Sequence, residues 1–293
     1  MNEVLVTGGA GQLGLALARH PWPDGWRAVA RSRAELDLTD PATLAAAVAE
    51  RRWAAVINAG AYTAVDRAES EPVLAWKVNA LAPAAFAAAC RAADVPLVQV
   101  STDYVFPGDR IGEWEEHHPT GPLGVYGASK LGGEWAVRTG CPRHAVVRTA
   151  WVVSADGHNF VKTMLRLAAE RPTLRVVADQ YGAPTSAADL AAALATIAMG
   201  LAVGRESGVW HFSNAGETSW AEFAEEVFAQ STARGGPSAS VEPIVTADFP
   251  TPACRPANSR LSLTAIERNW GIRPRPWQDA LGPILDTLIG PRP

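Results

Sequence analysis

Short apolar runs alternate with longer alanine-rich segments through the first half of the chain. Such runs are typical of strands buried on both faces of a sheet, and the longer segments are typical of helices. The first run is Val4-Leu5-Val6, followed by a helix that ends near His20. Further strands are predicted at 27–30, 55–58, 97–101 and 144–148, and further helices at 41–51, 72–92 and 126–139. This alternation predicts an α/β fold with a doubly wound parallel sheet and helices on both of its faces.

The pattern is less regular after Trp151. Helices are predicted at 159–170, 187–199 and 219–230, and strands at 174–177 and 209–212. Near the end of the chain, helical spacing relates Trp277, Leu281, Ile284 and Leu288, which predicts a core helix. A chain of 293 residues has room for two domains. We predict a first domain at 1–150, rejoined by part of 174–200, and a smaller α/β lobe at 151–293.

A glycine-rich turn follows the first predicted strand, with glycines at positions 8, 11 and 14. These glycines permit a tight turn and a close approach to a pyrophosphate, which would face the amides of the next helix. The spacing differs from the GxGxxG form, and glycine-rich turns between a strand and a helix also occur for packing alone. We favour a Rossmann-like dinucleotide-binding domain at 1–150.

Polar clusters follow three of the predicted strands, at 8–14, 59–63 and 101–104. The carboxyl ends of parallel strands meet at one edge of a sheet, where ligands bind. We therefore expect the three clusters to converge at one crevice. The segment 107–124 is a long loop rich in glycine, proline and acidic residues, which is typical of a lid or binding element.

Tyr126 and Lys130 are four residues apart in a predicted helix, so their side chains share one face. A nearby ammonium favours the phenolate, and this pairing predicts a lowered pKa for Tyr126. The phenol could then exchange a proton with a carbonyl or alcohol oxygen, and Thr102 could supply a second hydrogen bond to that oxygen. The alternative is a chance pairing of two residue types on an ordinary helix.

Composition excludes several classes of function. A net charge of −4 gives no basic footprint for nucleic acid. The three cysteines, Cys90, Cys141 and Cys254, are odd in number and far apart, which indicates a reduced, cytoplasmic setting. No stretch reaches the roughly 18 apolar residues of a membrane span, and the histidines lack metal-ligand spacing. We expect no nucleic-acid, membrane or metal partner.

Together, the glycine turn, Thr102 and the Tyr126/Lys130 pair resemble the extended short-chain dehydrogenase/reductase superfamily. Further stretches resemble the dTDP-4-dehydrorhamnose reductase family within it, and the resemblance spans nearly the whole chain. The stretches are 11–14, 64–72, 101–106, 148–151, 159–165, 179–185 and 258–261.

The resemblance implies a role for each matched residue. Tyr126 would donate a proton to the sugar C4 oxygen while nicotinamide delivers hydride, Lys130 would bind the nicotinamide ribose and tune the phenol, and Thr102 would orient the carbonyl. The remaining matches are Gly11, Gln12 and Leu13 for the pyrophosphate, Asp37 and Leu38 for adenine, Ala61, Tyr62 and Thr63 for the cofactor-side loop, and Asp103, Tyr104 and Trp151 for the sugar. An apolar core position is the alternative for Trp151. A solvated, acidic helix start is the interpretation kept for Asp66, Glu69 and Glu71.

The sequence departs from the family at two places. Arg31, with Arg33 close by, stands where many relatives carry an acidic residue after the second strand. A carboxylate there binds the 2′-hydroxyl of NAD, whereas arginine can pair with the 2′-phosphate of NADP, so we predict NADPH, with NADH as a second acceptable cofactor. Some relatives dimerise around Mg²⁺ held by glutamates, but this chain has Ala16 and Ala188 there. We therefore predict no metal, and either a monomer or a homodimer.

The activity implied by the resemblance is the NADPH-dependent reduction of dTDP-4-dehydro-6-deoxy-L-mannose to dTDP-L-rhamnose. Another nucleotide-sugar 4-ketoreductase, such as dTDP-dihydrostreptose synthase, is the enzymatic alternative. A non-catalytic subunit like the regulatory chain of methionine adenosyltransferase is the alternative from another class, and the complete set of Thr102, Tyr126 and Lys130 argues against it.

Overall fold

A six-stranded parallel sheet forms the centre of the computed structural model, which describes residues 1–291. The strand order is β10-β5-β4-β3-β1-β2. The strands are β1 (Asn2–Val6), β2 (Trp26–Ala30), β3 (Ala55–Asn58), β4 (Leu97–Thr102), β5 (His144–Thr149) and β10 (Gly208–His211). The order reverses between β1 and β3, because the chain extends the sheet first on one side of β1 and then on the other. This is the switch point at which open parallel sheets form a crevice.

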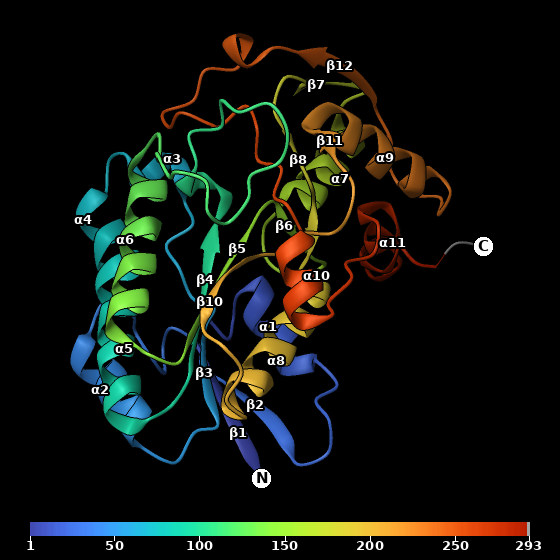
Figure 1. Cartoon of the computed structure of the whole chain (residues 1–293). Helices are drawn as coiled ribbons and strands as arrows, with labels where there is room; N and C mark the ends of the chain where they lie inside the picture. The colour runs from blue at the N-terminus through green and yellow to red at the C-terminus, as the bar shows by residue number, and fades with distance from the viewer. Residues whose placement is uncertain (292–293) are drawn as a thin grey trace.

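Helices cover both faces of the sheet, as the alternating pattern predicts (Figure 1). One face carries α1 (Gln12–Arg19) and α8 (Ala187–Ala202), and the other carries α2 (Pro41–Ala49), α5 (Ala82–Ala93) and α6 (Val125–Gly140). Successive strand side chains point to opposite faces. Accordingly Val4 and Val6 pack with Leu190 of α8, whereas Leu5 packs with Phe86 of α5. The predicted fold class is confirmed.

The predicted helix at 72–92 consists of three pieces: α4 (Pro72–Trp76), a π-helical turn (Lys77–Leu81) and α5. By length and composition alone, the run Pro72–Ala93 could cross a membrane, which contradicts the prediction that no stretch is apolar and long enough. It packs against α2 and α6, and its Phe86 and Ala87 are fully buried in the core. These contacts are those of a core helix.

The second half of the chain builds a smaller α/β body beside the sheet (Figure 1). Phe223, Val227 and Leu285 are among the residues at its apolar centre. Its helices are α7 (Phe160–Glu170), α9 (Trp220–Thr232) and α11 (Trp277–Leu288), and α11 buries Trp277, Leu281 and Ile284 as predicted. Helix α10 (Thr264–Trp270) instead packs on the large sheet beside β10. Its strand pairs are β7 (Thr173–Val177) with β12 (Ser240–Ile244), β6 (Val152–Val153) with β9 (Thr185–Ser186), and β8 (Tyr181–Gly182) with β11 (Thr218–Ser219). The boundary at residue 150 stays a prediction, although α8 and β10 lie on the large sheet.

Candidate active site

The glycine turn adopts a conformation that larger residues would obstruct. Gly8 has φ +69°, and a Cβ atom at Gly14 would lie 2.1 Å from the Gly8 carbonyl oxygen. Helix α1 begins at Gln12, and its N-cap residue, Gly11, provides no side-chain hydrogen bond to the first amides. The positive end of the helix dipole and these amides therefore face the switch point, where an anion can bind.

The three predicted polar clusters converge on one cleft of about 670 Å³. It extends from the glycine turn to Tyr126 and Lys130. The predicted residues that line it are Gly11, Gln12, Leu13, Asp37, Leu38, Ala61, Tyr62, Thr63, Thr102, Asp103, Tyr104, Tyr126, Lys130 and Trp151. The glycine cradle, the α1 amides and the length of this cleft fit a dinucleotide beside a second ligand.

The structure differs from the prediction at Arg31, which is absent from the cleft lining. The Arg31 guanidinium instead forms an ion pair with Glu50 at the end of α2. Arg33, two residues further on, lines the cleft beside Asp37, with 3.7 Å between its Nε and an Asp37 carboxylate oxygen. The side chain of Arg33 is 77% exposed and can reach a ligand phosphate. Arg33 therefore replaces Arg31 as the candidate residue for binding the 2′-phosphate of NADPH.

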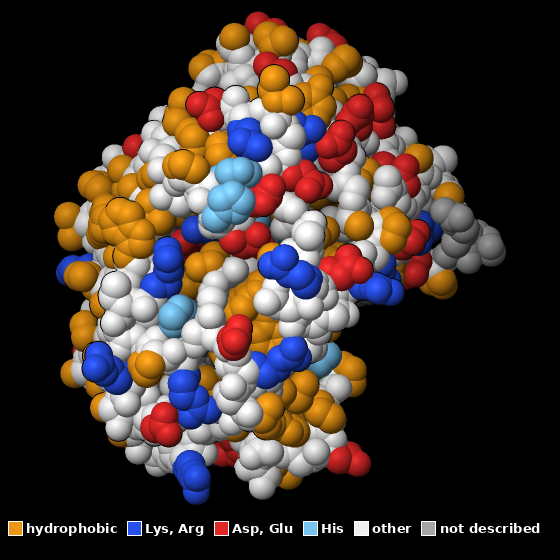
Figure 2. Space-filling view, viewed as in Figure 1, with side chains coloured by type: hydrophobic (Ala, Val, Ile, Leu, Met, Phe, Trp, Pro, Cys, Tyr) orange, Lys and Arg blue, Asp and Glu red, His pale blue; other side chains and the backbone are white. Residues whose placement is uncertain are grey.

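Helix α6 holds Tyr126 and Lys130 against the ends of β4 and β5. Its first turn comes so close to the chain after β4 that a Cβ atom at Gly127 would lie 2.2 Å from the Tyr104 carbonyl oxygen. Lys130 is 4% exposed, whereas Trp135 is 57% exposed on the outer side of the helix. Figure 2 shows hydrophobic side chains on that outer surface, over α4 and α6. Tyr126 and Lys130 thus belong to the inner face of α6, which faces the cleft.

The predicted direction of the Tyr126 pKa is wrong. Burial raises the pKa of the Tyr126 phenol above its ordinary value, and the Thr102 side chain only partly opposes this. The Lys130 ammonium donates to the Val100 carbonyl oxygen at 2.6 Å, and burial lowers the pKa of Lys130 to about 8. Desolvation of the phenolate is the largest cause, and the nearby Asp103 carboxylate adds to it. Tyr126 is therefore protonated at neutral pH, the state that a proton donor requires.

Thr102 and Asp103 form a buried pair at the end of β4. Thr102 Oγ1 donates to Asp103 Oδ1 at 2.9 Å and accepts a hydrogen bond from the Tyr104 amide at 3.2 Å. Asp103 is 3% exposed, and its Oδ2 has no hydrogen-bond partner among residues 1–291. Burial raises the pKa of Asp103 to about 6, and the neighbouring Ser259 and Thr102 side chains oppose part of this rise. A buried carboxylate oxygen without a partner, beside the cleft, suits a ligand that carries hydroxyl groups.

Trp151 combines the two interpretations that the sequence left open. Its ring lines the cleft and also stacks on Trp220 of α9, with 3.5 Å between centroids and 13° between planes. Its φ of +48° lies in the left-handed region, which is strained for a bulky residue. A Cβ atom at Gly182 would lie 2.8 Å from the indole, so Gly182 leaves the space that the ring occupies. The surrounding structure therefore fixes the orientation of Trp151 toward the cleft.

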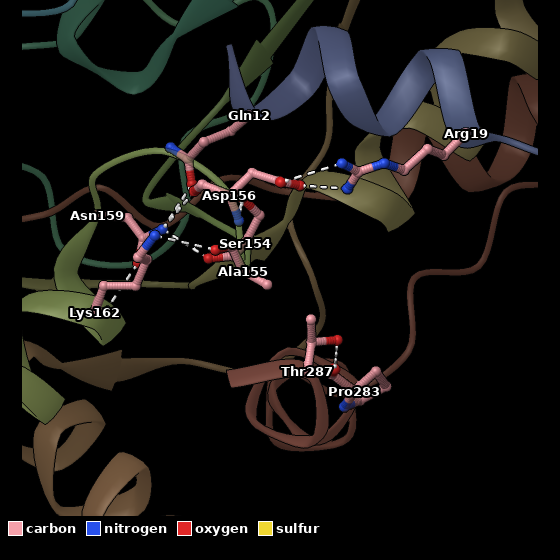
Figure 3. Close-up of polar contacts among 9 residues, drawn as sticks. All are labelled: Gln12, Arg19, Ser154, Ala155, Asp156, Asn159, Lys162, Pro283 and Thr287. Atoms are coloured by element: carbon pink, nitrogen blue, oxygen red, sulfur yellow. Dashed lines mark hydrogen bonds and ion pairs between the residues drawn. The ribbon is translucent and has the colours of Figure 1, made fainter. Parts of the chain in front are cut away.

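Ser154 and Asn159, to which the sequence assigned no role in the site, tie Gln12 of the glycine turn to the second half of the chain (Figure 3). Gln12 Oε1 accepts hydrogen bonds from Ser154 Oγ at 3.0 Å and from Asn159 Nδ2 at 2.9 Å. Asn159 also caps α7, and it lines the cleft. An Asn directly before a helical pattern is a capping signal, so Asn159 could have been found, but its contact with Gln12 spans 147 residues.

The three carboxylates interpreted as a solvated helix start do lie around the starts of α3 (Val65–Ala68) and α4 and are partly exposed, but each also has a specific partner. Asp66 forms a two-bond ion pair with Arg255, at 3.1 and 2.8 Å. Glu69 accepts the Val125 amide at 2.8 Å, at the first residue of α6. Glu71 accepts the Tyr62 hydroxyl at 2.6 Å. These side chains hold the segments that surround the cleft.

No three His, Cys, Asp or Glu side chains form a group that could hold a metal ion within residues 1–291. The carboxylate next to Ala188, Asp189, is bound by Arg275 at 2.9 and 3.0 Å. This ion pair occupies both carboxylate oxygens of Asp189.

The doubly wound sheet, the glycine turn at its switch point and the Tyr126/Lys130 pair on one helix face define an extended short-chain dehydrogenase/reductase. The family described as RmlD substrate binding domain matches residues 1–289. The chain belongs to the dTDP-4-dehydrorhamnose reductase family, since it is 44% identical to the dTDP-4-dehydrorhamnose reductase of Sinorhizobium fredii over 98% of each chain.

Two further relatives show the range of this similarity. The dTDP-4-dehydrorhamnose reductase of Bacillus anthracis, solved in complex with NADP, superimposes with a TM-score of 0.92 at 35% identity, covering 98% of this chain and 100% of that one. A Streptomyces antibioticus protein named "Probable dTDP-4,6-dihydroxy-2-methyloxan-3-one 4-ketoreductase" is 42% identical over 97% of this chain and 95% of its own. The similarity thus includes reductases named for different sugars.

Proposed function

We propose that this protein reduces the C4 keto group of dTDP-4-dehydro-6-deoxy-L-mannose to give dTDP-L-rhamnose, with NADPH as the reductant. The observation that carries the proposal is one continuous cleft, with an anion-binding glycine turn at one end and a protonated, half-buried phenol beside Thr102 at the other. The names of the relatives supply the substrate, and the NADP complex of the Bacillus anthracis relative supports the cofactor.

On the cofactor side, the chain offers a separate set of groups for each part of a dinucleotide. We assign the pyrophosphate to the amides around Gly11, Gln12 and Leu13, and the 2′-phosphate to Arg33. Asp37 and Leu38 form the adenine side of the cleft, and Ala61, Tyr62 and Thr63 form the wall beyond it. When bound, the reduced nicotinamide supplies the hydride for C4.

On the chemical side, Tyr126 Oη gives its proton to the C4 oxygen as that oxygen gains negative charge. Thr102 hydrogen-bonds the same oxygen and orients the carbonyl, which is a positioning role. The Lys130 ammonium holds the nicotinamide ribose beside the phenol. We assign Asp103, Tyr104 and Trp151 to the sugar, because the unpartnered Oδ2 of Asp103 can accept a sugar hydroxyl.

The related ketoreductase of Streptomyces antibioticus motivates a second candidate, reduction of a different dTDP-linked keto sugar at this same site. A changed pocket contact alters substrate preference by only about 1–3 kcal/mol. We also propose a cytoplasmic setting, where Cys90, Cys141 and Cys254 stay reduced, with the monomer and the homodimer both as predictions.

The test is NADPH oxidation in the presence of dTDP-4-dehydro-6-deoxy-L-mannose, with the product identified by NMR. We expect stoichiometric formation of dTDP-L-rhamnose and loss of activity in Tyr126→Phe. A product with the opposite configuration at C4, or a much higher kcat/KM for another dTDP-4-keto sugar, would favour the second candidate. Absence of NADPH oxidation with every such sugar would contradict both.

A further inference from the structure

A buried ion pair lies directly behind the catalytic end of the cleft. The Arg148 guanidinium on β5 donates to both carboxylate oxygens of Glu134 on α6, with Nε–Oε1 2.9 Å and Nη2–Oε2 2.7 Å. The two side chains are 2% and 0% exposed. Desolvation of two charges offsets most of their attraction, so stability alone is a weak reason for a pair at this depth.

Lys130 and Glu134 lie one turn apart on α6 and bind successive residues of β4. The Lys130 ammonium donates to the Val100 carbonyl oxygen at 2.6 Å. The Ser101 hydroxyl donates to Glu134 Oε1 at 2.5 Å. Thr102 is the next residue on this strand. The two charged side chains of α6 therefore hold β4 immediately before the residue that would orient the substrate carbonyl.

Several elements that pack against α6 carry charged or titratable groups. Among the charged groups around Lys130, the Glu134 carboxylate has the leading effect: it raises the pKa of Lys130 and so opposes the lowering by burial. The other groups are Tyr126 and Arg138 on α6, His144 and Arg148 on β5, Asp103 and Tyr104 after β4, Asp66 and Arg67 on α3 (Val65–Ala68), Lys77 in the π-helical turn, and Cys90 and Arg91 on α5.

Apart from the Glu116 carboxyl group, whose pKa is raised by burial and partly lowered by the Arg148 charge without an ion pair, Arg148 contacts neutral groups on its other side. Its Nη1 donates to the Glu116 carbonyl oxygen at 3.3 Å and lies 3.4 Å from His211 Nε2. Burial and the Arg148 charge hold the pKa of His211 well below its ordinary value, so His211 is neutral. Glu134 is therefore the counter-charge for Arg148 on one side and for Lys130 on the other.

We propose that Glu134 is a positioning residue for the reduction: its buried carboxylate, paired with Arg148 and one helical turn from Lys130, is the counter-charge that holds the Lys130 ammonium in place. The inference rests on the proposed function, because that function gives Lys130 its contact with the cofactor ribose. It adds a second layer to the site, in which Glu134 acts through Lys130 and never touches the reacting atoms.

The two halves of the pair are expected to move the pKa of Lys130 in opposite directions. Glu134→Gln removes the negative charge one turn from Lys130 and should lower its pKa. Arg148→Gln leaves the Glu134 carboxylate to Lys130 alone and should raise its pKa. If the pair had a purely structural role, both variants would be less stable, and the pKa of Lys130 would not shift in opposite directions in the two variants.

The chain contains only three lysines, Lys77, Lys130 and Lys162, which makes a direct measurement simple. Protein labelled with ¹³C at the lysine ε-carbon gives three signals, and Lys130→Arg identifies the one from Lys130. We expect it to titrate near pH 8 in the wild type, at lower pH in Glu134→Gln and at higher pH in Arg148→Gln. Lys77 and Lys162 serve as internal references, because neither contacts the pair.

Each single variant leaves a buried charge unpaired and can fail to fold, so two controls keep the test decisive. The double variant Glu134→Gln/Arg148→Gln contains no unpaired charge and should give a Lys130 pKa below the wild-type value. Asp286→Asn breaks an ion pair with the nearly buried Arg234, 2.8 Å long and remote from α6, and should leave Lys130 unchanged. An unaltered pKa in the double variant, or shifts of the same sign in both single variants, would overturn the proposal.

NADPH binding supplies the second measurement. If the pKa of Lys130 falls from about 8 to about 7, the ammonium fraction at pH 8 falls about fivefold. We expect at least that increase in the Kd for NADPH of Glu134→Gln at pH 8 and little change at pH 6. An unchanged Kd at pH 8 would overturn the role. A wild type that fails to bind NADPH would contradict the proposed function, while the titration would still decide the charge coupling.

Discussion

Replacing Asp103 by Asn should make the protein more stable and less active. Asp103 is 3% exposed, and burial raises the pKa of its carboxyl group from 3.8 to about 6. The protein therefore binds the proton more tightly when folded than when unfolded. The favourable contribution is fully present below pH 3.8 and is lost as the pH rises through 6. Asparagine has nearly the same shape and no charge to desolvate.

The size of the effect follows from these two pKa values. The penalty for ionised Asp103 is about 3 kcal/mol at pH 8 and about 1.5 kcal/mol at pH 5. The amide nitrogen of Asn would lie where Oδ2 lacks a partner, so an unsatisfied donor replaces an unsatisfied acceptor. We expect a net gain of about 1–3 kcal/mol in the free energy of unfolding at pH 8 and roughly half of it at pH 5.

Urea unfolding of wild type and Asp103→Asn at both pH values measures this gain, and steady-state kinetics measure what the change does to the site. KM for the keto sugar should rise, because an amide nitrogen cannot accept the hydroxyl that Oδ2 is proposed to bind. Ser154→Ala, which alters a less buried polar residue, is the matched control and should show no such pH dependence. A variant that is less stable at pH 8, or equally stabilised at both pH values, would refute the reasoning.

Three further predictions concern single side chains. Tyr126→Phe should lower kcat by at least about 10²-fold and leave the Kd for NADPH nearly unchanged, and activity within a few-fold of the wild type would remove its role as the acid. Arg33→Ala should lower kcat/KM for NADPH by about 10- to 150-fold and barely affect kcat/KM for NADH. Arg31→Ala should leave the ratio of the two kcat/KM values unchanged. The reverse result would make Arg31 the ligand of the 2′-phosphate. Trp151→Ala should raise KM and also lower the free energy of unfolding by about 3 kcal/mol, because the ring both lines the cleft and stacks on Trp220. A change in KM alone would assign the ring to the ligand, and a change in stability alone would assign it to the core.

The sequence carried the fold and the location of the site because both depend on local patterns. Buried parallel strands are apolar throughout, and a turn such as that at Gly8 and Gly14 requires glycine whatever surrounds it. Since parallel strands end at one edge, the residues after β1, β3 and β4 had to meet. Even the core helix α11 followed from a simple spacing of apolar residues.

The sequence could not supply side-chain contacts with partners that are distant along the chain. Arg31 pairs with Glu50, and Asp66 pairs with Arg255, 189 residues away. Spacing alone gave the distance between Tyr126 and Lys130 along a helix, but it gave no measure of their burial. That burial decides the sign of the pKa shift.

The pKa values also separate the roles of Lys130 and Tyr126 in the pH dependence of the reaction. Burial raises the pKa of Tyr126, so this residue keeps its proton throughout the range in which the enzyme can be assayed. Burial lowers the pKa of Lys130 to about 8, so its ammonium is present below that pH and is lost above it. The pH dependence of kcat/KM reports the ionisable groups of the free enzyme. The decrease of kcat/KM at alkaline pH (its alkaline limb) should therefore follow the deprotonation of Lys130. Lys130→Arg carries a charge that does not titrate there, and it should lose this limb even if its activity is low. An unchanged limb near pH 8 in that variant would return the titration to Tyr126 and contradict the assignment.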